Sequence, residues 1–117
     1  MRLNEIRYGK AVPVDGYGPG FFRVAGVVWH GPVLVTAEGA APWQGFADLE
    51  PLLRLVGQVD VLFVGTGAEV AHLPGAMVAA LEAAGIGVEP MASPTAARTY
   101  NVLLSEGRRV AVALLPL

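Results

Sequence analysis

The chain contains no cysteine and few charged residues. The missing cysteine excludes disulfides, thiolate nucleophiles and zinc–thiolate sites. Only 15% of the 117 residues are charged, whereas 54% are hydrophobic. The chain therefore has enough apolar material for a core without metals or cross-links, and its length fits a single domain over residues 1–117. So little charge is also compatible with self-association through apolar surface.

Basic residues and long apolar runs are scarce as well. Lys10 is the only lysine, Arg108-Arg109 is the only basic pair, and the net charge is −2. Nucleic-acid binding usually needs a basic stripe, so we do not expect a nucleic-acid partner. No run approaches the roughly 18 apolar residues of a membrane span, and residues 1–5 lack the apolar region of a signal peptide. We therefore expect a cytoplasmic protein without a membrane span.

The first half of the chain has the pattern of short strands. Residues 3–8 alternate apolar and polar side chains, as a half-buried strand does. Residues 13–20 are rich in Gly and Pro and predict a loop. Three β-rich runs at 22–24, 27–29 and 33–36 are separated by turn residues, which predicts an antiparallel meander.

The second half alternates helical and strand patterns. Leu49, Leu52, Leu53 and Val56 form a helical stripe that Asp48 would cap. A continuous apolar run at 60–64 follows and suits a strand buried on both faces. The pattern then predicts a helix over 74–84, closed by Gly85, and a strand over 86–89.

A third helix is predicted from Ser93, as N-cap, to Ser105, with Pro94 in its first turn and a strand over 108–115 behind it. Its expected apolar face consists of Ala96, Tyr100, Leu103 and Leu104. Strands alternating with helices call for a mostly parallel sheet. Together with the antiparallel first half, the sequence predicts an α/β fold with a mixed sheet covered by helices.

A glycine-rich loop, Gly65-Thr66-Gly67, comes directly after the predicted buried strand. Such loops often bind anions, because small residues let backbone N–H groups approach a phosphate. The dinucleotide fingerprint fails, however, at Val70, where a third glycine would stand, and there is no Walker lysine. The alternative interpretation is a tight turn that needs positive φ.

A polar stripe on the predicted third helix is the second candidate site. Arg98, Asn101 and Ser105 share one side of that helix, and Thr99 lies beside them. An arginine and an amide on one stripe can bind an anion or a partner's backbone. The alternative interpretation is a solvated helix face opposite the core.

The sequence offers no convincing metal site or nucleophile. Glu69 and His72 match E-x-x-H, but a second such motif is missing, and His30 lies in a predicted turn. There is no G-x-S-x-G motif. We therefore expect no metal, no cofactor and no catalysis, although a triad defined only by geometry stays open.

Several runs resemble an uncharacterised domain family of bacteria and archaea. They are Val64-Gly65-Thr66-Gly67, Leu73-Pro74, Gly85-Ile86-Gly87-Val88 and, above all, Arg98-Thr99-Tyr100-Asn101-Val102-Leu103-Leu104-Ser105-Glu106-Gly107-Arg108-Arg109-Val110. In eukaryotes this family includes an adipogenesis-associated protein and a mitochondrial assembly factor for respiratory complex I. The resemblance covers nearly the whole chain.

The resemblance implies a three-layer α/β fold with a central mixed sheet and an inserted β-hairpin, and it implies no established enzymatic activity. Related sequences carry a cysteine just before the motif arginine, where this chain has Ala97. Thiol chemistry in relatives is therefore closed to this chain. No mitochondrial leader is recognised, so the organelle role does not transfer directly.

Two functions follow as hypotheses. The first is a non-catalytic, assembly-factor-like domain that binds a protein partner. The second is a small-anion or nucleotide binder, or an enzyme. In a parallel sheet, the loops after 60–64 and 86–89 open on one edge, which would bring Arg98 near Gly67. The predicted binding residues are Gly65, Thr66, Gly67, Arg98, Thr99 and Asn101.

Overall fold

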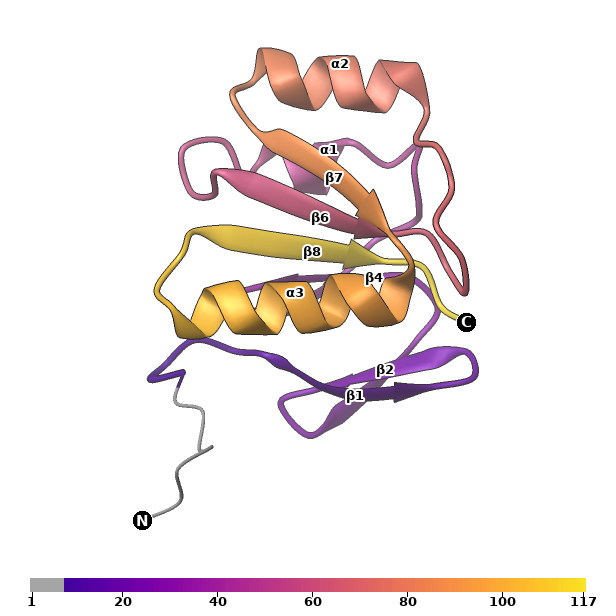
Figure 1. Cartoon of the computed structure of the whole chain (residues 1–117), viewed down its shortest axis with the longest axis vertical. Helices are drawn as coiled ribbons and strands as arrows, with labels where there is room; N and C mark the ends of the chain where they lie inside the picture. Colours follow the sequence, from indigo (N-terminus) through magenta and orange to yellow (C-terminus); the bar gives the residue numbers. More distant parts are fainter. Residues whose placement is uncertain (1–7) are drawn as a thin grey trace.

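The computed structural model describes residues 8–117 and is built on a five-stranded mixed sheet (Figure 1). Its strand order is β5 (Gly39–Pro42), β4 (Val33–Thr36), β8 (Val110–Leu114), β6 (Val61–Gly65) and β7 (Gly87–Met91). β6 pairs in parallel with both β7 and β8, whereas β4 is antiparallel to β8 and β5. The sheet thus joins a parallel half from the C-terminal sequence to an antiparallel hairpin.

The central strands are apolar throughout because both faces of this sheet are covered. Alternate residues of each strand enter two separate cores. One core receives Val33, Val35, Phe63, Val110, Val112 and Leu114. The opposite core receives Leu34, Leu62, Val64, Ala111 and Ala113.

A second sheet lies on one side of the first and consists of β1 (Val14–Gly18), β2 (Phe21–Val24) and β3 (Val27–His30), all antiparallel. Ala25 and Gly26, with φ of 51° and 77°, form the two-residue turn between β2 and β3. Positive φ at both positions is typical of a type I′ hairpin turn.

Three helices complete the layers: α1 (Glu50–Leu53), α2 (Gly75–Ala83) and α3 (Ser93–Ser105). In Figure 1, α3 lies in front of β8 and β4 and above the β1–β2 hairpin, whereas α1 lies behind the strands. The core on the α3 side also contains residues of β1 and β2, and the opposite core contains residues of α1 and α2. The predicted three-layer α/β fold with a mixed sheet is confirmed.

The structure corrects the predicted strands of the first half. The run at 13–20 is not a loop, because it contains β1, whose strand pattern is obscured by glycines. The run at 33–36 does not pair with 27–29; it leaves the small sheet and pairs with β8. Val33, Leu34 and Val35 are all buried, which requires cover on both faces, and only the larger sheet provides that. Of the strand predicted at 3–8, all but Tyr8 lies outside the described residues.

The first predicted helix is also corrected. It is a single turn, and the chain then continues through turns with i→i+3 bonds such as that from Leu55 N to Leu52 O, 3.1 Å. This tighter path buries Leu55 and Val59, while the predicted stripe residues Leu53 and Val56 are exposed. The predicted cap Asp48 instead accepts a bond from the backbone N–H of Gln44, 3.0 Å.

The other two helices are close to their predicted ranges. Gly85 closes α2 with φ of 86°, and Ile86 N donates to Leu81 O at 2.9 Å, as expected for a helix ended by a left-handed glycine. Ser93, however, is not the N-cap of α3. Ala92 occupies that position, and the Ser93 side chain bonds elsewhere.

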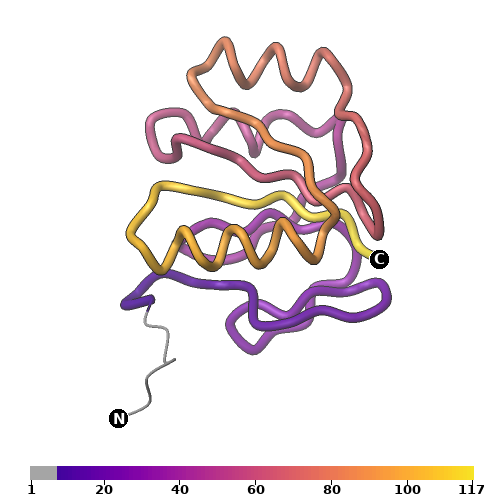
Figure 2. The backbone as a smooth tube through the Cα atoms, in the orientation of Figure 1, coloured from indigo at the N-terminus to yellow at the C-terminus, as the bar shows by residue number. Residues whose placement is uncertain are grey.

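The C-terminal residue is fixed against the small sheet. Gly20 N, in the β1–β2 turn, donates to Leu117 O at 2.9 Å. Figure 2 shows the C-terminus beside that turn. None of the helices within residues 8–117 is long and apolar enough to cross a membrane.

We predict that Leu62→Ala destabilises the fold by roughly 2–5 kcal/mol, because its side chain is fully buried in the middle of β6. Chemical denaturation measures the change. The exposed leucine in α1, Leu53→Ala, is the matched control and should change stability by less than about 1 kcal/mol. Equal losses of stability for the two substitutions would show that β6 is not part of the core.

Candidate functional site

The loop after β6 is part of a closed set of hydrogen bonds around Ser93, called here the Ser93 junction. The fully buried Ser93 hydroxyl donates to Leu115 O at 2.6 Å and accepts from Gly67 N at 2.8 Å. Ser93 N donates to Gly67 O at 2.7 Å, and Leu115 N donates to Gly65 O at 2.9 Å. The junction thereby joins the end of β6, the start of α3 and the end of β8.

Position 65 of the Ser93 junction requires glycine, because there is no space for a side chain. A Cβ atom there would lie 2.6 Å from Ser93 Oγ and 2.8 Å from both Ser93 Cα and Leu114 Cδ2. Gly67 has φ of 104°, a value that side chains disfavour. Positive φ therefore accounts for Gly67, as in the tight-turn interpretation, whereas close packing against Ser93 and Leu114 accounts for Gly65.

Thr66 folds the rest of this loop onto itself. Its backbone N–H donates to Met91 O at 2.8 Å. Its hydroxyl accepts from Ala71 N at 3.0 Å and lies 2.7 Å from Glu69 O, to which it can donate. The amides of Thr66 and Gly67 are therefore both hydrogen-bonded within the chain, and these are the donors on which the anion interpretation depended.

Asn101 pairs with the backbone of β1 in the way a neighbouring strand would. Its Oδ1 accepts from Val14 N at 2.8 Å and its Nδ2 donates to Val14 O at 2.9 Å. The hydroxyl of Tyr100, the residue just before Asn101, donates to Val12 O at 2.7 Å. Burial raises the pKa of Tyr100 above the ordinary range for a phenol. Both side chains tie the small sheet to α3.

The predicted polar stripe on α3 is divided between two surfaces. Asn101 faces β1, whereas Arg98 is exposed. Arg98 and Thr99 line a shallow hollow of about 360 Å³ together with Val102 and Leu103; we call this the α3 surface. Val102 is 51% exposed although it is apolar. Ser105 donates within the helix, to Val102 O at 2.6 Å.

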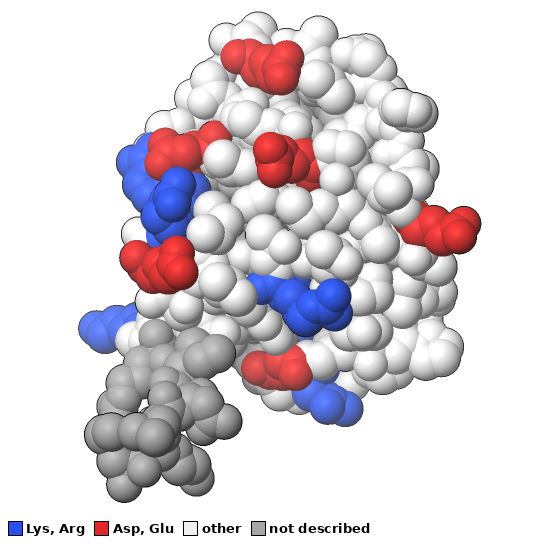
Figure 3. Space-filling view, viewed as in Figure 1, with Lys and Arg blue, Asp and Glu red and all other residues white. Residues whose placement is uncertain are grey.

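Arg98 and the glycine loop do not line a common hollow. Gly65 and Gly67 are buried in the Ser93 junction, and neither lines the hollow that contains Arg98. Figure 3 shows a basic patch near the middle of this face, with largely uncharged surface above it and an acidic and a further basic patch below it. The α3 surface thus combines one cation with apolar side chains.

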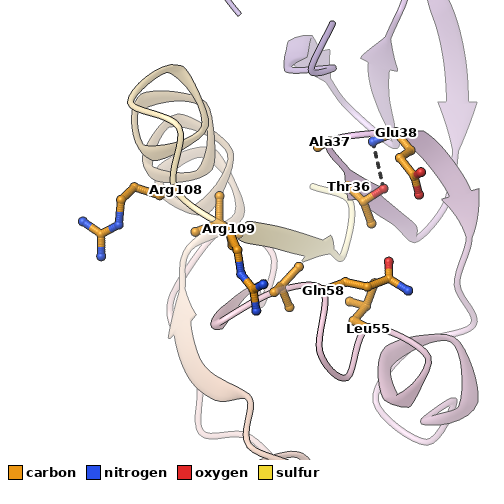
Figure 4. A pocket seen from close by; sticks show the side chains of 9 residues that line it. Thr36, Ala37, Glu38, Leu55, Gln58, Arg108 and Arg109 are labelled. Carbon is orange, nitrogen blue, oxygen red and sulfur yellow. Dashed lines mark hydrogen bonds between the residues drawn. The ribbon is translucent and has the colours of Figure 1, made fainter.

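A second hollow, of about 230 Å³, lies where β4 ends and β8 begins (Figure 4). Its lining comes from three distant segments, 36–38, 55–59 and 108–110. Arg109 Nη2 lies 3.2 Å from Asp60 Oδ1, and both side chains are exposed. The sequence does not indicate this hollow, because no local motif links segments so far apart.

The two histidines lie apart from these sites. His30 ends β3 and His72 lies in the loop before α2, and both are exposed. Residues 8–117 contain no group of three or more His, Cys, Asp or Glu side chains arranged to hold a metal ion.

Residues 14–115 match the family described as "Protein of unknown function (DUF498/DUF598)". The chain belongs to this family. An uncharacterized protein of Rhodobacter capsulatus is 56% identical over 117 residues, which is 100% of this chain and 94% of that protein. The family resemblance expected from the Arg98–Val110 run is confirmed.

A second relative carries a functional name. The NADH dehydrogenase (ubiquinone) 1 alpha subcomplex assembly factor 3 of Danio rerio is 33% identical over 110 residues. The match covers 88% of this chain and 63% of the assembly factor, so the chain spans less than two thirds of that relative. The family resemblance to complex I assembly factors is therefore confirmed.

Solved structures share the fold. An outer membrane protein from Bartonella henselae has a TM-score of 0.80 at 33% identity and covers 96% of this chain and 98% of its own. A Mth938-like domain from Bordetella pertussis has a TM-score of 0.78 at 34% identity and covers 99% and 92% respectively.

We predict that Ser93→Ala lowers stability by about 1–3 kcal/mol, because it leaves Gly67 N–H and Leu115 C=O without their buried partner. Thermal or chemical denaturation measures the loss. Ser105→Ala is the matched control, since its hydroxyl bonds only within α3. A Ser93→Ala protein as stable as the control would show that the junction contributes nothing to the fold.

Proposed function

We propose that this chain is a non-catalytic protein-binding domain with an assembly-factor-like role, and that its partner docks on the α3 surface. The proposal rests on one observation above all. A helix fixed to the fold along its inner side presents an exposed arginine and an exposed valine beside a hollow on its outer side. Relatives named as assembly factors support a protein as the occupant.

The α3 surface has the composition of a protein-binding site. Interfaces are enriched in arginine and in apolar side chains at their centre, and arginine is frequent among residues that dominate affinity. Val102 and Leu103 offer apolar contact area, and Arg98 offers a cation for a carboxylate or a backbone carbonyl. The partner segment should therefore carry an apolar side chain next to an acidic one.

The predicted binding residues take two roles in this proposal. Arg98 and Thr99 contact the partner directly. Gly67 and Asn101 hold α3 in place through hydrogen bonds that involve the backbone. Gly65 leaves the space that Ser93 occupies, and Thr66 folds the loop after β6 through its bonds to Met91 and Ala71. A rigid helix loses little conformational freedom on binding, which favours affinity.

No observation favours the alternative of a small-anion or nucleotide binder, or of an enzyme. The N–H groups of Thr66 and Gly67 are already bonded inside the chain. Arg98 lines a hollow to which neither glycine contributes. Placement in the cytoplasm remains our expectation.

We predict that a photo-crosslinking residue at position 102 captures a discrete protein partner in the natural host, because Val102 lies at the rim of the hollow. The matched control is position 70, where the native Val70 is 63% exposed but lies on a loop away from α3. Mass spectrometry then identifies the adduct. A subunit of a respiratory complex would support the assembly role.

A second variant tests the arginine. Arg98→Glu should reduce the adduct at position 102 by roughly ten- to a hundred-fold, the value of a charge-assisted hydrogen bond lost to the partner. Arg108→Glu reverses the charge of another exposed arginine, one that does not line this hollow, and should leave the adduct unchanged. Equal adducts at positions 102 and 70, or an adduct indifferent to Arg98→Glu, would reject the α3 surface as the docking site.

A further inference from the structure

The two sheets have four edge strands, and three of them are protected against pairing with another chain. β7 carries Glu89 and Pro90, and β5 ends in Pro42. Charges and prolines on an edge are common means of blocking a further strand. β1 is occupied by Asn101, which bonds both backbone groups of Val14.

The fourth edge, β3, has none of these protections. Its sequence is Val27-Val28-Trp29-His30, without lysine, aspartate, glutamate or proline, and its pairing with β2 runs without a bulge. No strand within residues 8–117 pairs with its outer side. Val27 and Val28 are 55% and 41% exposed, so apolar side chains accompany the open edge.

The hairpin fixes which backbone groups of β3 face outward. In a two-residue hairpin the closing pair, here Val24 and Val27, exchanges hydrogen bonds, and hydrogen-bonded and non-hydrogen-bonded pairs then alternate. Val28 and His30 are therefore in non-hydrogen-bonded positions relative to β2. Their N–H and C=O groups point away from β2, toward the open edge.

We propose that β3 pairs antiparallel with β3 of a second copy of this chain. A two-fold axis at Trp29 places Val28 of one copy opposite His30 of the other, and the reverse. Every outward N–H and C=O group of the two strands then has a partner. The hydrogen-bonding groups of this edge are therefore complementary to those of a second copy, as a symmetric dimer requires.

The side chains and the strand length both suit a second copy. Like charges directly opposite each other destabilise a strand pair, and β3 contains no lysine, arginine, aspartate or glutamate. Turns bound the strand on both sides, at Ala25-Gly26 and at Gly31-Pro32, so a second β3 matches the length of this edge. The low charge content of the chain, 15%, points the same way.

The dimer should be weak and concentration-dependent, because each copy contributes one strand of four residues. Sedimentation equilibrium and amide hydrogen exchange between about 10 µM and about 1 mM cover the range expected for so small an interface. The wild-type protein should shift from monomer to dimer over this range. The amides of Val28 and His30 should exchange more slowly as the dimer forms.

Val28→Pro is the decisive variant. It removes only an outward N–H group, so the β2–β3 hydrogen bonds stay intact while the edge can no longer accept a second strand. Val28→Lys places a charge at the same position and should also prevent the pairing. It replaces the proline variant in this test if that variant does not fold. Val70→Lys, at an exposed valine far from β3 in sequence, is the matched control and should dimerise like the wild type.

Loss of the dimer in the Val28 variants, with retention in Val70→Lys, would support the proposal. A wild-type protein that stays monomeric up to about 1 mM would overturn it, including the case in which β3 is reserved for a strand of another protein. A dimer that persists in both Val28 variants would overturn it as well, because it would use another surface.

Discussion

Three side chains on α3 take the place of backbone partners for distant parts of the chain. Ser93 bonds Gly67 and Leu115, Tyr100 bonds Val12 O, and Asn101 bonds both backbone groups of Val14. These bonds are buried or partly buried, where a missing partner costs more than it does in water. α3 is thereby fixed to the large sheet at its N-terminus and to the small sheet along its middle, and the relative position of the two sheets depends on it.

Because α3 is bonded to both sheets, its residues divide into those that hold the fold together and those that are exposed. The inner side of α3 is committed to the fold, whereas Arg98 and Val102 remain on the outside. The two surfaces that we propose for interaction lie on the outer face of this helix and on an open strand edge. The two proposed surfaces, the α3 surface and β3, belong to different elements and can be tested separately.

Sequence patterns predicted best the elements whose pattern is uninterrupted. α2 and α3 have enough residues for periodicity and flanking glycine or proline to specify them, and β6 is a continuous apolar run. β1 was not predicted because glycines interrupt its strand pattern. α1 is only one turn long because the chain after it follows a tighter path that buries Leu55 and Val59. The sequence shows that Arg98 and Asn101 share one side of the helix. It does not show that Asn101 bonds β1 while Arg98 is exposed, because the partner of Asn101 lies 87 residues away.

The structural claim about α3 is tested most directly by hydrogen exchange in Asn101→Ala. Without the side-chain amide, Val14 loses both partners, so the amides of β1 and its neighbours in the small sheet should exchange roughly ten- to a hundred-fold faster. Those of β6 and β7 should keep their wild-type rates. Unchanged exchange at Val14, or an equal increase throughout the chain, would contradict the role assigned to α3.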